Sequence, residues 1–213
     1  KKIGPDEPCL IVAEMSGNHD GDFEKAKQII HKAFESGADA IKFQTYKPDT
    51  ITLESDREDF RIPSNSPWGK YKTFYDLYKK AHTPYSWHYD AFKYAKKNKK
   101  ILFSSPFSTK AVDFLEKFNV PIYKIASFEI TDLKLVDYIA RTKKPVILST
   151  GMASYKEVNQ AIITIEKYHS KIIILHCVSG YPTDLKDTNL KKLKEIQKKY
   201  SKYSIGVSDH TNE

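Results

Sequence analysis

Short apolar runs rich in β-branched residues alternate with longer amphipathic stretches along the whole chain. The runs, which we expect to be strands, are Leu10–Ala13, Ala40–Phe43, Ile101–Phe103, Ile122–Ile125, Val146–Leu148, Ile172–Leu175 and Ser204–Val207. The stretches with helical spacing of apolar residues include Phe23–Ser36, Thr109–Phe118, Leu133–Arg141, Tyr155–Tyr168 and Leu190–Tyr200. This alternation predicts βαβ units and a parallel α/β sheet.

Two architectures satisfy this pattern, the doubly wound sheet and the (βα)8 barrel. Continuously apolar strands fit both, because both bury the sheet on its two faces. No Gly-x-Gly-x-x-Gly follows the first run, so the main signal of a nucleotide-binding sheet is missing. We therefore expect a TIM-type (βα)8 barrel, of which seven strand–helix units are visible.

The sequence ends just after the seventh run. A barrel that lacked one βα unit would expose two strand edges. We therefore expect residues 1–213 to be a barrel domain truncated before strand eight, in a natural chain that continues further.

The segment Lys47–Thr83, after the second run, is unusually long and is rich in Asp, Ser, Pro and Tyr. A loop of that size on a compact domain is usually functional. Since the loops after the strands choose substrates in βα barrels, we expect this one to overhang the barrel mouth. Its candidate contacts are Asp56, Arg57, Glu58, Trp68 and Tyr71.

The net charge of +8 comes from 35 Lys and Arg against 27 Asp and Glu, and only Arg57, Arg61 and Arg141 are arginines. Because nucleic-acid readers usually depend on arginine forks, lysines spread along the chain predict a solvated surface and no nucleic-acid partner.

Cys9 and Cys177 lie in apolar runs and are expected to be buried strand thiols in a reducing compartment. With no membrane-length apolar stretch and no signal peptide, we expect a cytoplasmic protein, although the chain starts without Met.

Polar residues gather where the predicted strands end, and the strand ends of βα barrels carry the chemistry. They are Glu14, Lys42, Gln44, Ser104, Ser105, Lys124, Ser127, Glu129, Ser149, Thr150, His176, Tyr181, Thr183, Ser208, Asp209 and His210. Two lysines with several hydroxyls suit a small, multiply charged anion. The carboxylates and His210 add acid–base or metal-ligand capacity.

Each of these residues also has a structural interpretation. A lysine at a strand end is most often a surface residue, and His176 is more often a satisfied core histidine than a ligand. Lys42 and Gln44, however, share one face of a strand, and an inward-facing pair of this kind is costly unless it binds something. The repetition of polar strand ends is the stronger signal.

At these residues the sequence resembles the sialic-acid synthases and their nonulosonate relatives. The motifs that carry the resemblance occur in order across nearly the whole chain. They are Ile11-Val-Ala-Glu-Met-Ser-Gly-Asn-His19, Gly37-Ala-Asp-Ala-Ile-Lys-Phe-Gln44, Ser104-Ser-Pro-Phe107, Tyr123-Lys-Ile-Ala-Ser127, Leu148-Ser-Thr-Gly-Met152, His176-Cys177, Tyr181-Pro-Thr183 and Gly206-Val-Ser-Asp-His210.

The resemblance implies a barrel that condenses phosphoenolpyruvate with an open-chain amino-sugar aldehyde, using a divalent metal such as Mn²⁺, Mg²⁺ or Co²⁺. It also implies a homodimer in which a C-terminal antifreeze-like domain, absent from residues 1–213, caps the partner's barrel. By motif, Lys42, Gln44, Ser105, Lys124, Ser127, Ser149 and Ser208 correspond to phosphoenolpyruvate-binding residues. Glu14 and His210 correspond to catalytic residues, His210 as one of two metal ligands with the second beyond Glu213, and Glu129 and Tyr181 to sugar contacts.

Within the family, the segment after the second strand and Ser127-Phe128-Glu129 resemble the pseudaminic-acid branch. That branch implies 2,4-diacetamido-2,4,6-trideoxy-altrose as the acceptor, whereas N-acetylneuraminate or legionaminate synthesis is the alternative. Two other classes stay open on the residues alone: a Schiff-base aldolase with Lys42 or Lys124 as nucleophile, and a non-enzymatic module that binds phosphorylated sugars.

Overall fold

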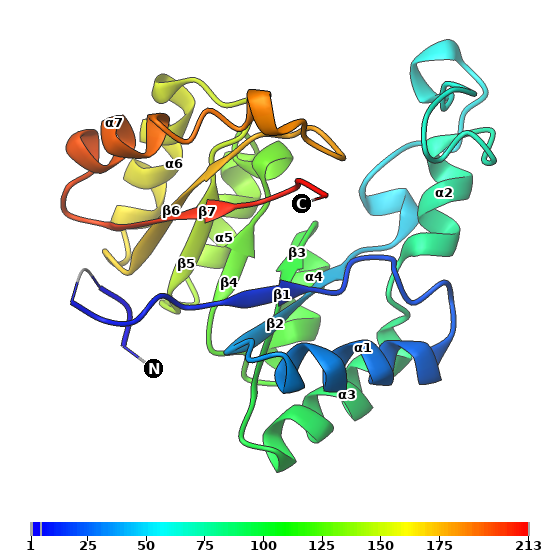
Figure 1. The fold of residues 1–213 in the computed structure, drawn as a ribbon, viewed down its shortest axis with the longest axis horizontal. Helices are drawn as coiled ribbons and strands as arrows, with labels where there is room; N and C mark the ends of the chain where they lie inside the picture. Colours follow the sequence, from blue (N-terminus) through cyan, green and yellow to red (C-terminus); the bar gives the residue numbers. More distant parts are fainter. Residues whose placement is uncertain (1, 5, 213) are drawn as a thin grey trace. The chain divides into compact units, whose positions relative to one another are not determined.

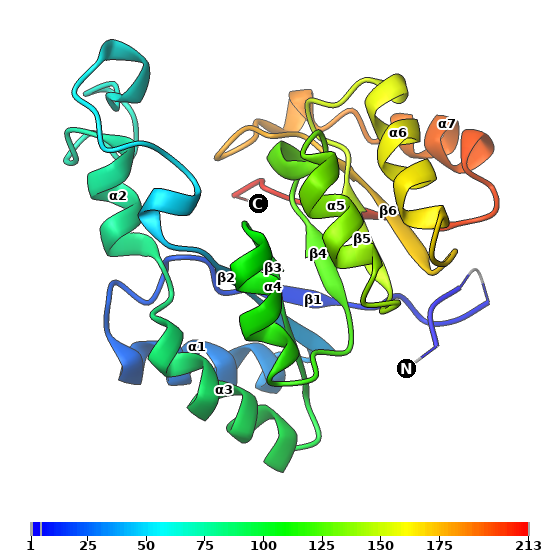
Figure 2. The same ribbon diagram turned by 180° about the vertical axis from the view of Figure 1, so that it is seen from behind.

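The chain forms two compact units, each built from alternating strands and helices (Figures 1 and 2). The computed structural model describes residues 2–4 and 6–212. One unit is Leu10–Val120, and the other is formed by Pro121 onwards together with the segment that precedes Leu10. Each unit holds a separate part of the expected site.

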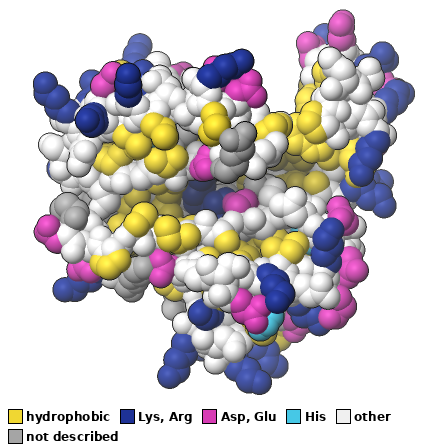
Figure 3. All heavy atoms as spheres, in the orientation of Figure 1, with side chains coloured by type: hydrophobic (Ala, Val, Ile, Leu, Met, Phe, Trp, Pro, Cys, Tyr) yellow, Lys and Arg dark blue, Asp and Glu magenta, His cyan; other side chains and the backbone are white. Residues whose placement is uncertain are grey.

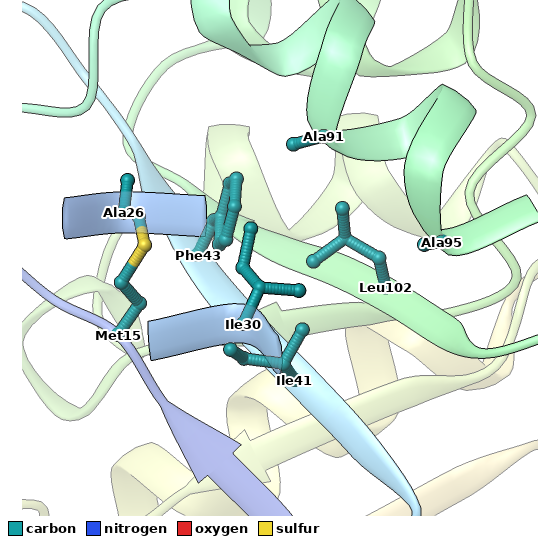
Figure 4. Packing of buried hydrophobic residues seen from close by; sticks show 8 residues of the cluster. All are labelled: Met15, Ala26, Ile30, Ile41, Phe43, Ala91, Ala95 and Leu102. Carbon is teal, nitrogen blue, oxygen red and sulfur yellow. The ribbon is translucent and has the colours of Figure 1, made fainter. Parts of the chain in front are cut away.

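The unit Leu10–Val120 contains a parallel sheet in which β2 lies between β1 and β3. Its elements are β1 (Val12–Glu14), α1 (Phe23–Glu35), β2 (Ala40–Thr45), α2 (Phe74–Ala81), α3 (Tyr85–Lys97), β3 (Ile101–Pro106) and α4 (Thr109–Glu116). Apolar residues from this sheet, α1 and α3 form one core, shown in Figure 4: Met15, Ala26, Ile30, Ile41, Phe43, Ala91, Ala95 and Leu102.

Helix α1 shows how local sequence fixes an element. The Asp22 side chain accepts hydrogen bonds from the backbone N–H groups of Glu24 (2.8 Å) and Lys25 (3.4 Å), which starts the helix. Ser36 is the C-cap, and Gly37 follows with φ +93°, a conformation that glycine adopts at little cost. This cap and turn lead the chain directly into β2.

The second unit contains a parallel sheet in the order β4, β5, β6, β7. Its elements are β4 (Tyr123–Ile125), α5 (Leu133–Ala140), β5 (Val146–Ser149), α6 (Tyr155–Glu166), β6 (Ile172–Cys177), α7 (Lys192–Lys199) and β7 (Ser204–Ser208). Both faces of β4 and β5 are buried, as their continuously apolar sequence predicts.

Within each unit, every strand pairs with the next strand in the sequence. A doubly wound sheet would instead reverse its strand order at a switch point. The sequential order is that of a TIM-type barrel, so the predicted fold class is confirmed. All seven predicted strands are present at the expected places in the described part of the chain.

Two expectations from the sequence are wrong. The segment Lys47–Thr83 is not a loop throughout, because α2 forms within it after short 3-10 turns at Pro48–Thr50 and Glu58–Phe60. Thr73 and Asp76 form a capping box that starts this helix despite the polar, aromatic composition of the segment. Cys9 is exposed rather than buried, since β1 begins only at Val12. Cys177 is buried at the end of β6, as expected.

The basic side chains are scattered over the visible surface among acidic and uncharged ones (Figure 3). This distribution agrees with the predicted solvated lysine surface. Among the described residues, no helix is both long and apolar enough to cross a membrane.

Candidate functional site

In the unit Leu10–Val120, the polar strand-end residues lie on one face of the sheet. Glu14 of β1 is the register partner of Lys42 on β2, and Gln44 of β2 is the register partner of Ser105 on β3. Register partners in a parallel pair point to the same side, and so do residues two apart on one strand. The structure therefore brings Glu14, Lys42, Gln44 and Ser105 together.

Lys42 forms an ion pair with Glu14 across the two strands. The Lys42 side chain is only 14% exposed, whereas Glu14 is an exposed residue whose side chain is 35% accessible. The carboxylate provides the compensation that a lysine inside an apolar strand needs. An incoming anion would meet a lysine that is already held in place.

A buried hydrogen-bond chain lies behind these residues. The Thr45 hydroxyl is 2.8 Å from His88 Nε2 and 2.6 Å from the Ser104 hydroxyl, and His88 Nδ1 is 3.1 Å from the Pro84 carbonyl oxygen. Because that carbonyl can only accept, Nδ1 carries the proton and Nε2 accepts from Thr45. Burial lowers the pKa of His88 to about 4, so the ring stays neutral and keeps this pattern. The chain ties α3 to the ends of β2 and β3.

In the second unit, Lys124 is only 8% exposed. Burial lowers its pKa, while the nearby Cys177 and Glu129 act in the opposite direction. Burial also raises the pKa of Glu129 to about 7, against the opposing charge of Lys124. A carboxyl group of this kind can give or take a proton near neutral pH.

Cys177 links two of the predicted site residues. Its Sγ accepts a hydrogen bond from the Ser127 hydroxyl at 3.5 Å and lies 3.9 Å from His210 Nδ1. Burial would raise the pKa of the thiol, but the His210 and Ser127 contacts bring it down to about 7. The sequence predicted a buried thiol and missed this role, for which the only available signal was the position of Cys177 at a strand end.

Several buried polar atoms of this unit have no hydrogen-bond partner among the described residues: Ser149 Oγ, Glu129 Oε2 and Ser179 Oγ. In the other unit, Ser105 Oγ is likewise buried and has no hydrogen-bond partner among the described residues. A buried polar atom without a partner costs about 1–3 kcal/mol, so Glu129 Oε2, Ser149 Oγ and Ser179 Oγ indicate a place for a polar ligand within the second unit. Ser179 was not among the predicted site residues.

Gly151 lies in the middle of this group, where an added methyl group would force its neighbours to shift. A Cβ at this position would meet the hydroxyls of Ser179 and Ser127, the latter at 2.9 Å, and Cys177 Sγ at 3.1 Å. The space that a methyl group would fill is therefore lined by three polar side chains. Such a cradle suits the oxygens of a small anion.

Of the remaining predicted residues, Ser208 is half-buried and is the register partner of Cys177. The Tyr181 ring lies 4.2 Å from the His210 ring, between centroids. His176 is a core residue, as expected, since it is 6% exposed and its Nε2 lies 2.8 Å from the Thr188 carbonyl oxygen. The convergence of the residues of both units at one barrel mouth stays a prediction.

His210 is the one predicted metal ligand in this chain. Its Nδ1–H donates to the Val178 carbonyl oxygen at 2.8 Å, which leaves Nε2 as the atom that can bind a metal. The described residues contain no group of three or more His, Cys, Asp or Glu side chains that could hold an ion. They therefore fit one ligand of a metal site and not a complete one.

Comparisons with known proteins agree with the geometry. A model of the NeuB family matches residues 29–213. The chain is 45% identical over 206 residues to the pseudaminic acid synthase of Helicobacter pylori, covering 96% of this chain and 60% of that protein. It is 35% identical to the N,N'-diacetyllegionaminic acid synthase of Legionella pneumophila, covering 99% of this chain and 60% of that protein. The chain thus spans about 60% of the length of these curated relatives.

Solved structures show the same fold. The N-acetylneuraminic acid synthetase of Leptospira borgpetersenii, crystallised with citrate, matches with a TM-score of 0.86 at 32% identity, covering 98% of this chain and 67% of that one. A truncated 3-deoxy-D-arabino-heptulosonate 7-phosphate synthase from Thermotoga maritima matches with a TM-score of 0.67 at 15% identity, covering 98% of this chain and 66% of that one, which supports the fold alone.

Proposed function

The chain belongs to the NeuB family, and from this premise we propose that the protein containing it condenses phosphoenolpyruvate with an open-chain amino-sugar aldehyde. The products are a nonulosonic acid and phosphate. The observation that carries the proposal is the set of buried, unpartnered hydroxyls at Ser105, Ser149 and Ser179, in units that also contain Lys42 and Lys124. These groups match a substrate that carries both a phosphate and a carboxylate.

The lysines and hydroxyls bind and orient phosphoenolpyruvate. Lys42, held by Glu14, and the buried Lys124 supply positive charge, while Ser127 and the unpartnered serines supply directed hydrogen-bond donors. Fixing both substrates before they react removes part of the entropic barrier. C3 of phosphoenolpyruvate attacks the aldehyde carbon, water adds at C2, and the tetrahedral intermediate loses phosphate by cleavage of the C–O bond.

Glu14 and Glu129 manage protons in this scheme. Glu14 is paired with Lys42 and is therefore held as a carboxylate, the form that accepts a proton from the attacking water or the new hydroxyl. Glu129, whose pKa is about 7, can contact a sugar hydroxyl or amide in either protonation state, with Tyr181 beside His210. His210 Nε2 would hold a divalent metal together with ligands from outside the described residues, and a bound metal supplies Lewis acidity toward the aldehyde oxygen.

We further propose that the acceptor is the pseudaminic-type sugar, 2,4-diacetamido-2,4,6-trideoxy-altrose. The support is the identity of 45% to a pseudaminic acid synthase, against 35% to a legionaminate-type enzyme and 30% to the human N-acetylneuraminate-9-phosphate synthase. We place the reaction in the cytoplasm and in a homodimer, without nucleic-acid or membrane partners.

Phosphate release from phosphoenolpyruvate by the whole protein tests the proposal, with this sugar and N-acetylmannosamine supplied in competition. We expect release that depends on the sugar, with preference for the trideoxy sugar. Preference for N-acetylmannosamine would move the protein to the neuraminate branch. Binding of phosphorylated sugars without turnover would make it a binding module.

One observation favours a second candidate, a Schiff-base aldolase. Burial lowers the pKa of Lys124, and a neutral lysine amine is a nucleophile that can condense with a carbonyl group. Borohydride reduction in the presence of pyruvate distinguishes the two, because only the aldolase forms an adduct with Lys124 that can be trapped. We expect no adduct.

A further inference from the structure

Large apolar side chains remain exposed beside the polar residues of the second unit. Phe128 is 57% exposed, Tyr181 is 46% exposed and Met152 is 75% exposed. Phe128 lies between Ser127 and Glu129, Tyr181 lies against His210, and Met152 follows Gly151. Polar groups thus line the interior of this part of the site, and apolar groups lie at its solvent side.

The exposure of Phe128 does not result from a loose segment. Phe128 is the middle residue of the 3-10 turn Ser127–Glu129, where Ser127 is 6% exposed and the following Ile130 is 1% exposed. The backbone N–H of Glu129 donates to the Ala126 carbonyl oxygen at 3.1 Å. Two buried neighbours therefore fix the turn, and the phenyl ring is held in solvent next to two predicted substrate contacts.

Phe128 is also the best suited of the three exposed side chains to recognise an apolar group. Tyr181 already packs against the His210 ring and carries a hydroxyl. Met152 is an unbranched, flexible side chain. Phe128 offers a rigid, wholly apolar ring whose position is set by the backbone on both sides.

Resting on the proposed function, we propose that Phe128 is a specificity-determining residue that selects an acceptor whose terminal carbon is a methyl group. The aldehyde carbon must reach phosphoenolpyruvate at the polar interior, so the opposite end of the open-chain sugar is directed toward solvent. A methyl group there gains by contact with the phenyl ring, whereas a hydroxymethyl group would lose its hydration. The buried Oε2 of Glu129, which has no hydrogen-bond partner in the described chain, accepts from a hydroxyl or amide N–H of the same sugar.

The test compares two acceptors that differ only at the terminal carbon, the 2,4-diacetamido-2,4,6-trideoxy sugar and its 6-hydroxy counterpart. In the whole protein, we expect the wild type to prefer the methyl-bearing sugar by about tenfold or more, the range for a change of this size in an apolar pocket. Phe128→Ala should remove most of this preference and leave the KM for phosphoenolpyruvate unchanged. Phe128→Leu should keep most of the preference, since it retains apolar cover.

Tyr89→Ala is the matched control, because Tyr89 is a 63% exposed aromatic residue on α3 that takes no part in the site. A wild type without preference between the two sugars, or a preference that Phe128→Ala leaves intact, would overturn the inference while the proposed function stands. Absence of phosphate release with either sugar in the wild type would refute the proposed function itself. Unchanged KM values for phosphoenolpyruvate confirm that the variants are folded.

Discussion

Lys42 faces Glu14 directly across β1 and β2, and the two side chains form an ion pair at the end of β1 and midway along β2. The Lys42 side chain is mostly shielded from water, whereas both side chains of the pair between Lys25 and Asp20 in the same unit are solvent-exposed. Because a charge near the interior is screened less by water and salt, Lys42 is suited to bind a substrate anion and Lys25 is not.

Replacement of Lys42 by alanine should lower kcat/KM for phosphoenolpyruvate at least tenfold in the whole protein. The variant loses a charge-assisted hydrogen bond, which is worth about 1.5–3 kcal/mol. Steady-state kinetics with saturating sugar measure the effect, and Lys25→Ala is the control, expected to behave as the wild type. Near-wild-type kinetics of the Lys42 variant would remove this residue from the binding set.

Gly151→Ala should weaken phosphoenolpyruvate binding because the added methyl group occupies the cradle formed by Ser127, Cys177 and Ser179. We expect an increase in KM of about tenfold or more, since the Ser179 and Ser127 hydroxyls must shift out of position to make room. Gly4→Ala is the control, because a Cβ there meets nothing within 4 Å. An unchanged KM would show that the anion binds elsewhere.

Lys124→Met should abolish the stabilisation of the protein by phosphoenolpyruvate without lowering the stability of the free protein. Lys124 is buried beside Glu129, and when the lysine charge is removed Glu129, whose pKa is already about 7, can take up a proton, so that no uncompensated buried charge is left. Thermal unfolding with and without the ligand measures both effects. The assignment is wrong if the variant still gains stability from phosphoenolpyruvate as the wild type does.

Chelation of divalent metal should abolish turnover by the whole protein, and added Mn²⁺, Mg²⁺ or Co²⁺ should restore it. His210→Ala should bind the metal at least tenfold more weakly, because Nε2 of this ring is the atom left available by the bond from Nδ1 to Val178. Calorimetric titration of metal into each protein gives the affinities. Full activity in chelator would rule out this role for His210.

The protein should lose stability through His88 as the pH is lowered from about 6.5 to 4. In the unfolded chain His88 titrates near 6.5, whereas in the folded protein its pKa is about 4. Between these values the unfolded state binds more protons, so the free energy of unfolding falls as the pH falls. At 1.36 kcal/mol per pKa unit, the total loss is about 3 kcal/mol.

Urea denaturation at a series of pH values measures this loss. His88→Gln, which cannot be protonated, should show a flatter dependence over the same range even if its stability is lower at pH 7. Equal slopes for the wild type and the variant would show that His88 does not carry this effect.

The sequence by itself determined the strand positions, the order of the strand–helix units and the polar residues at the strand ends. It could do so because apolar runs, caps such as Asp22 and turns such as Gly37 act over a few residues. The alternation of faces along β2 was enough to place Lys42 and Gln44 together. The family resemblance then followed from motifs that need no three-dimensional information.

Only the tertiary structure decided which of these residues are partners. The pairing of Glu14 with Lys42, the contact of Cys177 with Ser127 and His210, and the chain from Thr45 to His88 all join residues more than 25 positions apart. Composition also predicted two features wrongly. The polar segment Lys47–Thr83 contains the helix α2, because Thr73 and Asp76 form a capping box that starts it. Cys9 is exposed, because β1 begins three residues after it. The protonation states of Lys124, Glu129 and His88 depend on burial and neighbouring charge, which exist only once the chain has folded.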